Sequence, residues 1–132
     1  MRRILPDGWP RPRGYSNGVA ASGEQIFIAG QIGWNEREEI VSEDFAKQAV
    51  QALRNVVAVL RAAGGQPQHL TRMTWYVVDK REYLNATQAI GKAYREIIGA
   101  HYPAMTLVQV AALLEDRAKV EIEATAVVPV TQ

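Results

Sequence analysis

The sequence predicts an α+β domain in which a mixed sheet of about six strands carries two helices on one face. Two long stretches, residues 42–63 and about 80–98, place apolar side chains three and four residues apart, as amphipathic helices do. Several shorter stretches alternate apolar and polar residues, which indicates strands with one buried face. Because each helix has a single apolar stripe, both helices are expected to pack on the same face of the sheet.

The composition is typical of one globular domain. The 132 residues are 48% hydrophobic and 22% charged, so residues 1–132 are expected to form a single domain with an irregular N-terminal arm over residues 1–14. A net charge of +1 argues against binding to nucleic acid or to a membrane. The absence of cysteine and the presence of only two histidines argue against a metal site. No apolar run fits a signal peptide or a membrane span, so a cytoplasmic location is predicted.

The first strands are expected in the N-terminal third of the chain. Residues 19–22 and 25–29 are short apolar runs separated by Gly23 and Glu24, a pattern typical of a hairpin. Gly30 interrupts the second run. A glycine there indicates a bend, or another group close to the backbone.

The central part of the chain predicts helix, strand and helix. The helix over residues 42–63 is expected to begin at Ser42 as its N-cap and to end at Gly64. The strand covers residues 71–78. The second helix follows a capping pattern made by Asp79 and Glu82, and it ends at Gly99.

The C-terminal stretch from 102 to 129 reads as two extended segments joined by a charged turn. Glu121 and Glu123 lie two residues apart, so they leave the same face of their strand, while Ile122 leaves the other face. From this pattern alone, a solvated strand face is the simplest interpretation of the two carboxylates. Met105 would likewise be an ordinary core or interface methionine.

Several segments carry a resemblance to a known family. Residues 102–113 read YPAMTLVQVAAL, residues 119–127 read KVEIEATAV, and GYS, IAGQI, QALRN and AAGG occur in that order at 14–16, 28–32, 51–55 and 62–65. In sequence and order these segments resemble the RidA/YjgF family of small proteins. The resemblance covers nearly the whole chain, from about Gly14 to Val128.

The resemblance implies a YjgF/chorismate mutase-like fold, a trimeric barrel-like assembly and small-molecule clefts between subunits. The best described activity in the family is hydrolysis of reactive imines and enamines such as 2-aminoacrylate, without a metal or a cofactor. Carried over by position, the catalytic carboxylate falls on Glu121, a tyrosine at the cleft mouth on Tyr15, and a backbone donor on Leu107. A polar amide falls near Gln88, and Met105 and Thr106 complete the set of expected substrate-binding residues.

One family position differs in this chain. The family motif reads Pro-Ala-Arg-Ser/Thr, and here Met105 stands before Thr106 in place of the arginine that binds the substrate carboxylate. A thioether has no charge and no strong donor, so about 2–5 kcal/mol of binding would be lost. The sequence therefore favours a small-metabolite binder or diverged hydrolase over a 2-aminoacrylate deaminase. The alternative is a deaminase that uses Glu121 and a water on a different imine, and Arg11 or Arg13 could replace the missing cation.

Overall fold

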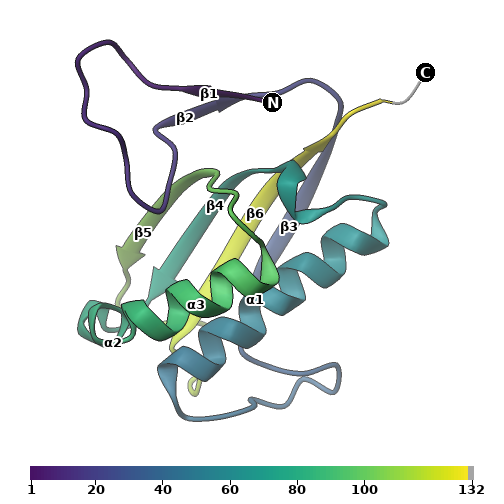
Figure 1. The fold of residues 1–132 in the computed structure, drawn as a ribbon. Helices are drawn as coiled ribbons and strands as arrows, with labels where there is room; N and C mark the ends of the chain where they lie inside the picture. The colour runs from purple at the N-terminus through teal and green to yellow at the C-terminus, as the bar shows by residue number, and fades with distance from the viewer. Residues whose placement is uncertain (131–132) are drawn as a thin grey trace.

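The computed structural model describes residues 1–130 and shows an α+β fold (Figure 1). Its strands are β1 (Arg2–Ile4), β2 (Gly18–Ala20), β3 (Glu24–Ile32), β4 (Leu70–Val77), β5 (Ala104–Gln109) and β6 (Val120–Val128). Its helices are α1 (Phe45–Ala62), α2 (Lys80–Asn85) and α3 (Thr87–Ile97), with a 3-10 turn, η1, over Pro67–His69. The described residues include no helix that is long and apolar enough to cross a membrane.

Four strands form the central mixed sheet in the order β3-β6-β4-β5, and β1 and β2 form a separate two-stranded ribbon. The β4–β5 pair is parallel, whereas β6 is antiparallel to both of its neighbours. The predicted mixed sheet is therefore confirmed, with four of the six strands in it. The two C-terminal segments are not neighbours, because β4 lies between β5 and β6.

The predicted hairpin near Gly23 is wrong. Strand β2 pairs with β1, with Arg2 opposite Ala20, so the arm expected to be irregular contains a strand. Strand β3 pairs instead with β6 along most of its length. The reason lies at Gly23, which has a φ of 148° and packs so closely on the backbone of Val128 that a Cβ would overlap it. This packing directs β3 onto β6 rather than back onto β2.

The hydrophobic core lies between one face of the sheet and the helices. Figure 1 shows α1 and α3 side by side across that face. Strands β4 and β6 contribute Met73, Trp75, Val77, Val120, Ile122 and Ala124, and α1 contributes Ala49, Ala52, Leu53, Val56 and Leu60. Because strand side chains alternate, the residues between these leave the opposite face, which no helix covers.

The first helix begins later than the sequence predicts. Asp44, not Ser42, is the N-cap, and its carboxylate accepts a hydrogen bond from the Lys47 N–H at 3.0 Å. The Ser42 hydroxyl instead accepts from the Asp44 N–H at 3.0 Å. Both residue types can cap, and the burial of Phe45 selects Asp44. The predicted end is confirmed, since Gly64 has a φ of 85°.

The second predicted helix is divided into α2 and α3 at Ala86. Asp79 caps α2, accepting from the Arg81 N–H at 2.9 Å. No glycine or proline marks the break in the sequence, so packing decides it. Tyr83 of α2 contacts the ring of Trp75, whereas α3 buries Ile90 against the core.

We expect Leu53→Ala to lower the free energy of unfolding by about 2–5 kcal/mol, because Leu53 is fully buried and the neighbouring side chains cannot close the cavity completely. Urea denaturation measures this change. Val59→Ala is the matched control on the exposed side of α1, and it should change stability by less than about 1 kcal/mol. Equal effects of the two substitutions would contradict the assignment of the core.

Candidate functional site

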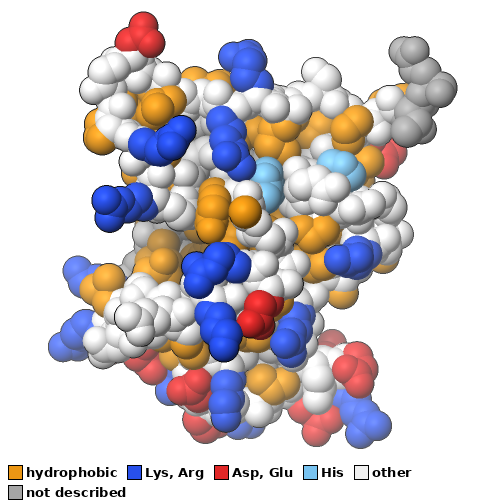
Figure 2. Space-filling view, viewed as in Figure 1, with side chains coloured by type: hydrophobic (Ala, Val, Ile, Leu, Met, Phe, Trp, Pro, Cys, Tyr) orange, Lys and Arg blue, Asp and Glu red, His pale blue; other side chains and the backbone are white. Residues whose placement is uncertain are grey.

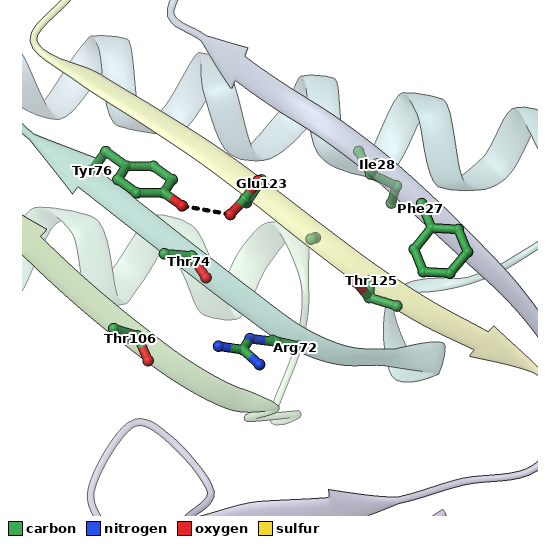
Figure 3. Close-up of a pocket in the computed structure, with 9 residues that line it drawn as sticks. Phe27, Ile28, Arg72, Thr74, Tyr76, Thr106, Glu123 and Thr125 are labelled. Carbon is green, nitrogen blue, oxygen red and sulfur yellow. Dashed lines mark hydrogen bonds between the residues drawn. The ribbon is translucent and has the colours of Figure 1, made fainter. Parts of the chain in front are cut away.

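The uncovered face of the sheet carries a cavity of about 330 Å³ (Figure 3). Its lining includes Phe27 of β3, Arg72, Thr74 and Tyr76 of β4, Thr106 of β5 and Glu123 of β6. In the register of the sheet, Thr74 lies opposite both Thr106 and Glu123. These side chains therefore project from three adjacent strands onto one surface.

One strong hydrogen bond crosses this cavity. The Tyr76 hydroxyl donates to the Glu123 carboxylate at 2.5 Å, as the dashed line in Figure 3 shows. This hydrogen bond raises the pKa of Tyr76 above its usual value, and burial and the negative charges of Glu123 and Glu121 raise it further. Tyr76 is therefore a neutral hydrogen-bond donor over the physiological pH range.

Arg72 is a site residue that the sequence analysis missed. Its guanidinium lines the cavity on the uncovered face of the sheet, which is called the open-face cavity below. The guanidinium forms no salt bridge among residues 1–130. The available signal was its spacing, because Arg72 lies two residues before Thr74 and so shares its face.

Glu121 lies against the backbone of Gly30. A Cβ on Gly30 would overlap the Glu121 carboxylate and come within 2.7 Å of its Cδ. The β3–β6 register shifts between Ile28 and Gln31, which gives the strand room at this point. The predicted close approach at Gly30 is thus confirmed, and the group that approaches is the predicted catalytic carboxylate. Glu123, rather than Glu121, lines the open-face cavity.

The loop before β2 holds Tyr15 at the start of β5. The Ser16 N–H donates to the Pro103 carbonyl at 2.9 Å, and the Ser16 hydroxyl donates to the Tyr102 carbonyl at 2.5 Å. Tyr15, Met105 and Thr106 then line one cavity of about 260 Å³, together with Arg72. The structure therefore brings three of the predicted binding residues together.

Met105 and Glu121 occupy opposite faces of the sheet. Met105 packs on the core and pairs in register with the buried Met73. Glu121 pairs with Tyr76, whose side chain crosses the open face. Within one protomer, the predicted catalytic carboxylate and the residue that replaces the arginine are therefore not brought together.

The other two predicted binding residues, Leu107 and Gln88, lie on the edge strand β5 and on α3. Strand β5 is an edge strand, and the Val110 N–H donates to the Val77 carbonyl at 2.9 Å. Since N–H groups alternate along a strand, the Leu107 N–H points to the unpaired edge, as a backbone donor for a ligand must. Gln88 is exposed in the first turn of α3, and its neighbours Thr87 and Gly91, not Gln88, line the groove beside Met105.

The two arginines that could replace the missing cation, Arg11 and Arg13, lie in different surroundings. Arg11 lines a cavity of about 460 Å³ beside the N-terminal arm, with Arg3, Tyr15 and Tyr102. Arg13 is exposed. Among the described residues, no group of three His, Asp or Glu side chains has the arrangement of a metal site. On the face in Figure 2, basic side chains are scattered among apolar and other polar ones and form no continuous surface.

Comparison with known proteins decides the family. The family model described as Endoribonuclease L-PSP matches residues 10–128. The chain belongs to the RidA/YjgF family. Among its relatives, a RutC family protein of Pyrococcus horikoshii is 35% identical over 125 residues, which are 93% of this chain and 94% of that protein. The 2-iminobutanoate/2-iminopropanoate deaminase of Escherichia coli is 38% identical over 107 residues, 80% of each chain.

Solved structures of the RidA/YjgF family agree with this fold. The Rid-family protein YyfB of Yersinia pestis, a protein of unknown function, has a TM-score of 0.85 and 35% identity and covers 96% of this chain and 98% of its own. E. coli TdcF with bound serine has a TM-score of 0.67 and 34% identity, with 96% and 98% covered. The family resemblance read from the sequence is therefore confirmed.

We expect Gly30→Ala to destabilise the protein by about 1–3 kcal/mol, because the new methyl group displaces the Glu121 side chain. In Gly30→Ala/Glu121→Ala most of this loss should be recovered, which a double-mutant cycle in urea measures. Gly91→Ala is the control. A Cβ there meets only Arg95, at 3.7 Å, so helix propensity should make it stabilising. Additive effects of the substitutions at 30 and 121 would rule out the contact.

Glu123→Gln should lower the pKa of Tyr76 towards its usual value near 10.0, because it removes the carboxylate that accepts the phenol proton and repels the phenolate. In the wild type, the raised pKa of Tyr76 contributes stability that is fully present at pH values below the pKa of this tyrosine in the unfolded chain. This contribution is lost as the pH rises through the pKa of Tyr76 in the folded protein. The variant should therefore lose less stability in alkaline solution. Tyrosinate absorbance, with Tyr76→Phe as the reference, measures the titration of Tyr76. An equal titration midpoint in the wild type and in Glu123→Gln would contradict the predicted fall in pKa.

Proposed function

We propose that this RidA/YjgF-family protein binds a small metabolite in a cleft between the subunits of a homotrimer and does not act on 2-aminoacrylate. One observation carries the proposal. Tyr15, Met105 and Thr106 surround a single cavity at the β5 edge, so the binding position is kept while a thioether replaces the family cation. The loss of a guanidinium at position 105 removes a bidentate contact for a small 2-imino acid, and the cation that remains in the cavity, Arg72, comes from β4 instead.

The uncovered sheet face supports an assembly of several copies. Phe27 is 74% exposed there, and the face bears no helix. A site that uses both Glu121 and Met105 needs two protomers, because the two residues lie on opposite faces of one sheet. The unpaired edge of β5 in one copy and the Glu121 side of β6 in the next would provide the two halves of such a cleft.

A second candidate is hydrolysis of a different imine, and the position of Glu121 favours it. In this reaction water adds to the C=N carbon, the carboxylate takes a water proton, and ammonia leaves as a C=O bond forms. Glu121 lies against the bare backbone of Gly30, so the bend in β3 and the absence of a side chain at position 30 fix where the carboxylate lies. The candidate is supported by relatives that are 2-iminobutanoate/2-iminopropanoate deaminases.

An amino-acid oxidase that supplies a series of imines, 2-iminopropanoate and others generated from different amino acids, separates the two candidates. We expect the wild type to release ammonia no faster than buffer does, and Glu121→Ala to behave in the same way. Acceleration by the wild type that is lost in Glu121→Ala, but retained in the neighbouring Glu123→Ala, would establish the hydrolase and refute the binder.

Met105→Arg should create activity on 2-imino acids, with a rate at least ~10-fold above the wild type, because it restores a charge-assisted contact to the substrate carboxylate. Met105→Leu is the matched control and should remain inactive. The same oxidase-coupled assay measures both variants. If Met105→Arg is folded and trimeric and its rate is unchanged, the loss of activity does not come from this position.

A further inference from the structure

A second groove, of about 270 Å³, lies between β5 and α3 on the helix side of the sheet. Trp75, Tyr83, Tyr94, Tyr102, Met105 and Arg95 line it. We propose that this groove binds a small monocarboxylate with an aromatic body, and that Arg95 holds its acid group. The inference rests on the proposed function, because Met105 belongs to this groove and to the cavity at Tyr15, so both are parts of one cleft.

The walls of the groove fit an aromatic body. The rings of Tyr94 and Tyr102 are stacked with centroids 5.4 Å apart, and Tyr83 meets Trp75 edge to face at 5.9 Å. The thioether of Met105 completes the apolar lining. Aromatic rings and sulfur both interact favourably with another ring, and no carboxylate from residues 1–130 lines the groove to repel an anion.

Arg95 places a positive charge at the rim of this apolar groove. Its guanidinium lies over Gly91, with one terminal nitrogen 3.7 Å from where a Cβ of Gly91 would be. Because Gly91 has no side chain, nothing separates the guanidinium from the groove. Arg95 is exposed and forms no salt bridge among residues 1–130, so its charge is available to an anion.

The geometry selects Arg95 over the other candidate arginines. The side chain of Met105 takes the helix side of the sheet, so a cation that compensates for it must lie on that side. Arg72 emerges on the open face and shares only the cavity at the β5 edge with Met105, and Arg11 lines the cavity beside the arm. Arg95 lines the groove that contains Met105.

Trp75 is a local reporter for this groove. Its indole N–H is the single buried side-chain donor or acceptor in the described part of the chain that has no hydrogen-bond partner. Trp75 is 2% exposed and lines the groove, so its N–H serves as a local reporter of binding.

The position of Arg95 also favours a ligand that is larger than a three-carbon imino acid. A guanidinium at position 105 would come from the sheet, whereas Arg95 comes from the helix across the groove. An acid held at Arg95 can extend a six-membered ring over Met105. A three-carbon imino acid held there would leave the aromatic walls without contacts.

The test uses 3-phenylpropanoate as the probe and its uncharged amide as the comparison, with binding to the full-length protein measured by calorimetry. We expect the wild type to prefer the acid by about 10-fold, the size of one charge-assisted contact at a rim. Arg95→Gln should remove this preference. Lys92→Gln, which removes a charge from an exposed position of the same helix, should retain it.

A second variant blocks the groove without removing the charge. Gly91→Leu, for which the backbone has room, should abolish binding of both probes. The indole N–H resonance of Trp75, assigned with Trp75→Phe, should shift when 3-phenylpropanoate binds to the wild type and stay unchanged in Gly91→Leu. A resonance that does not move while the acid binds would place the ligand elsewhere and refute the inference.

The outcomes separate this inference from the proposed function. Equal binding of acid and amide, or a preference that survives in Arg95→Gln, would refute the role of Arg95 and leave an apolar metabolite site in place. No binding of either probe at millimolar concentration would refute the inference altogether. The imine assays with Glu121 and Met105 variants test the proposed function separately.

Discussion

The placement of β6 in the middle of the sheet, with helices on only one side, is the constraint on which the rest of this structure depends. Its apolar residues, such as Ile122, must face α1 and α3, because that face is the only one the helices cover. Alternation then forces Glu121 and Glu123 onto the open face. The carboxylates are therefore held on a polar surface by the same burial that forms the core.

The same constraint places polar and apolar side chains on opposite faces of the sheet. On the open side, Tyr76, Glu123 and Arg72 form a polar surface around a cavity. On the helix side, tyrosines and Met105 form an apolar groove with a charge at its rim. The β5 edge joins the two sides, since Tyr15 and Thr106 line the cavity at its start. A ligand bound at this edge can therefore meet both environments, and a neighbouring copy can complete the site.

Under the proposed function, the replacement of a family arginine by Met105 takes on a different meaning in this setting. A thioether at position 105 extends the apolar wall of the groove and joins the core. The positive charge at the groove comes from Arg95 on α3 instead. Under the proposals made above, a charge on the helix rather than on the strand would keep the attraction for an anion and change the size and shape of the molecule that it selects.

The sequence by itself determined the helices, most of the strands, the family and the shared face of Glu121 and Glu123, because these follow from periodicity and local motifs. It did not determine that β2 pairs with β1, that α2 and α3 separate at Ala86, or that Asp44 caps α1. Those features depend on tertiary packing, that is, on which strands and helices contact one another. Arg95 carries no local signal and the spacing of Arg72 indicates only its strand face, since a charged residue on a strand or helix usually faces solvent. Only tertiary packing placed them beside cavities, because strands and helices distant in sequence build those cavity walls.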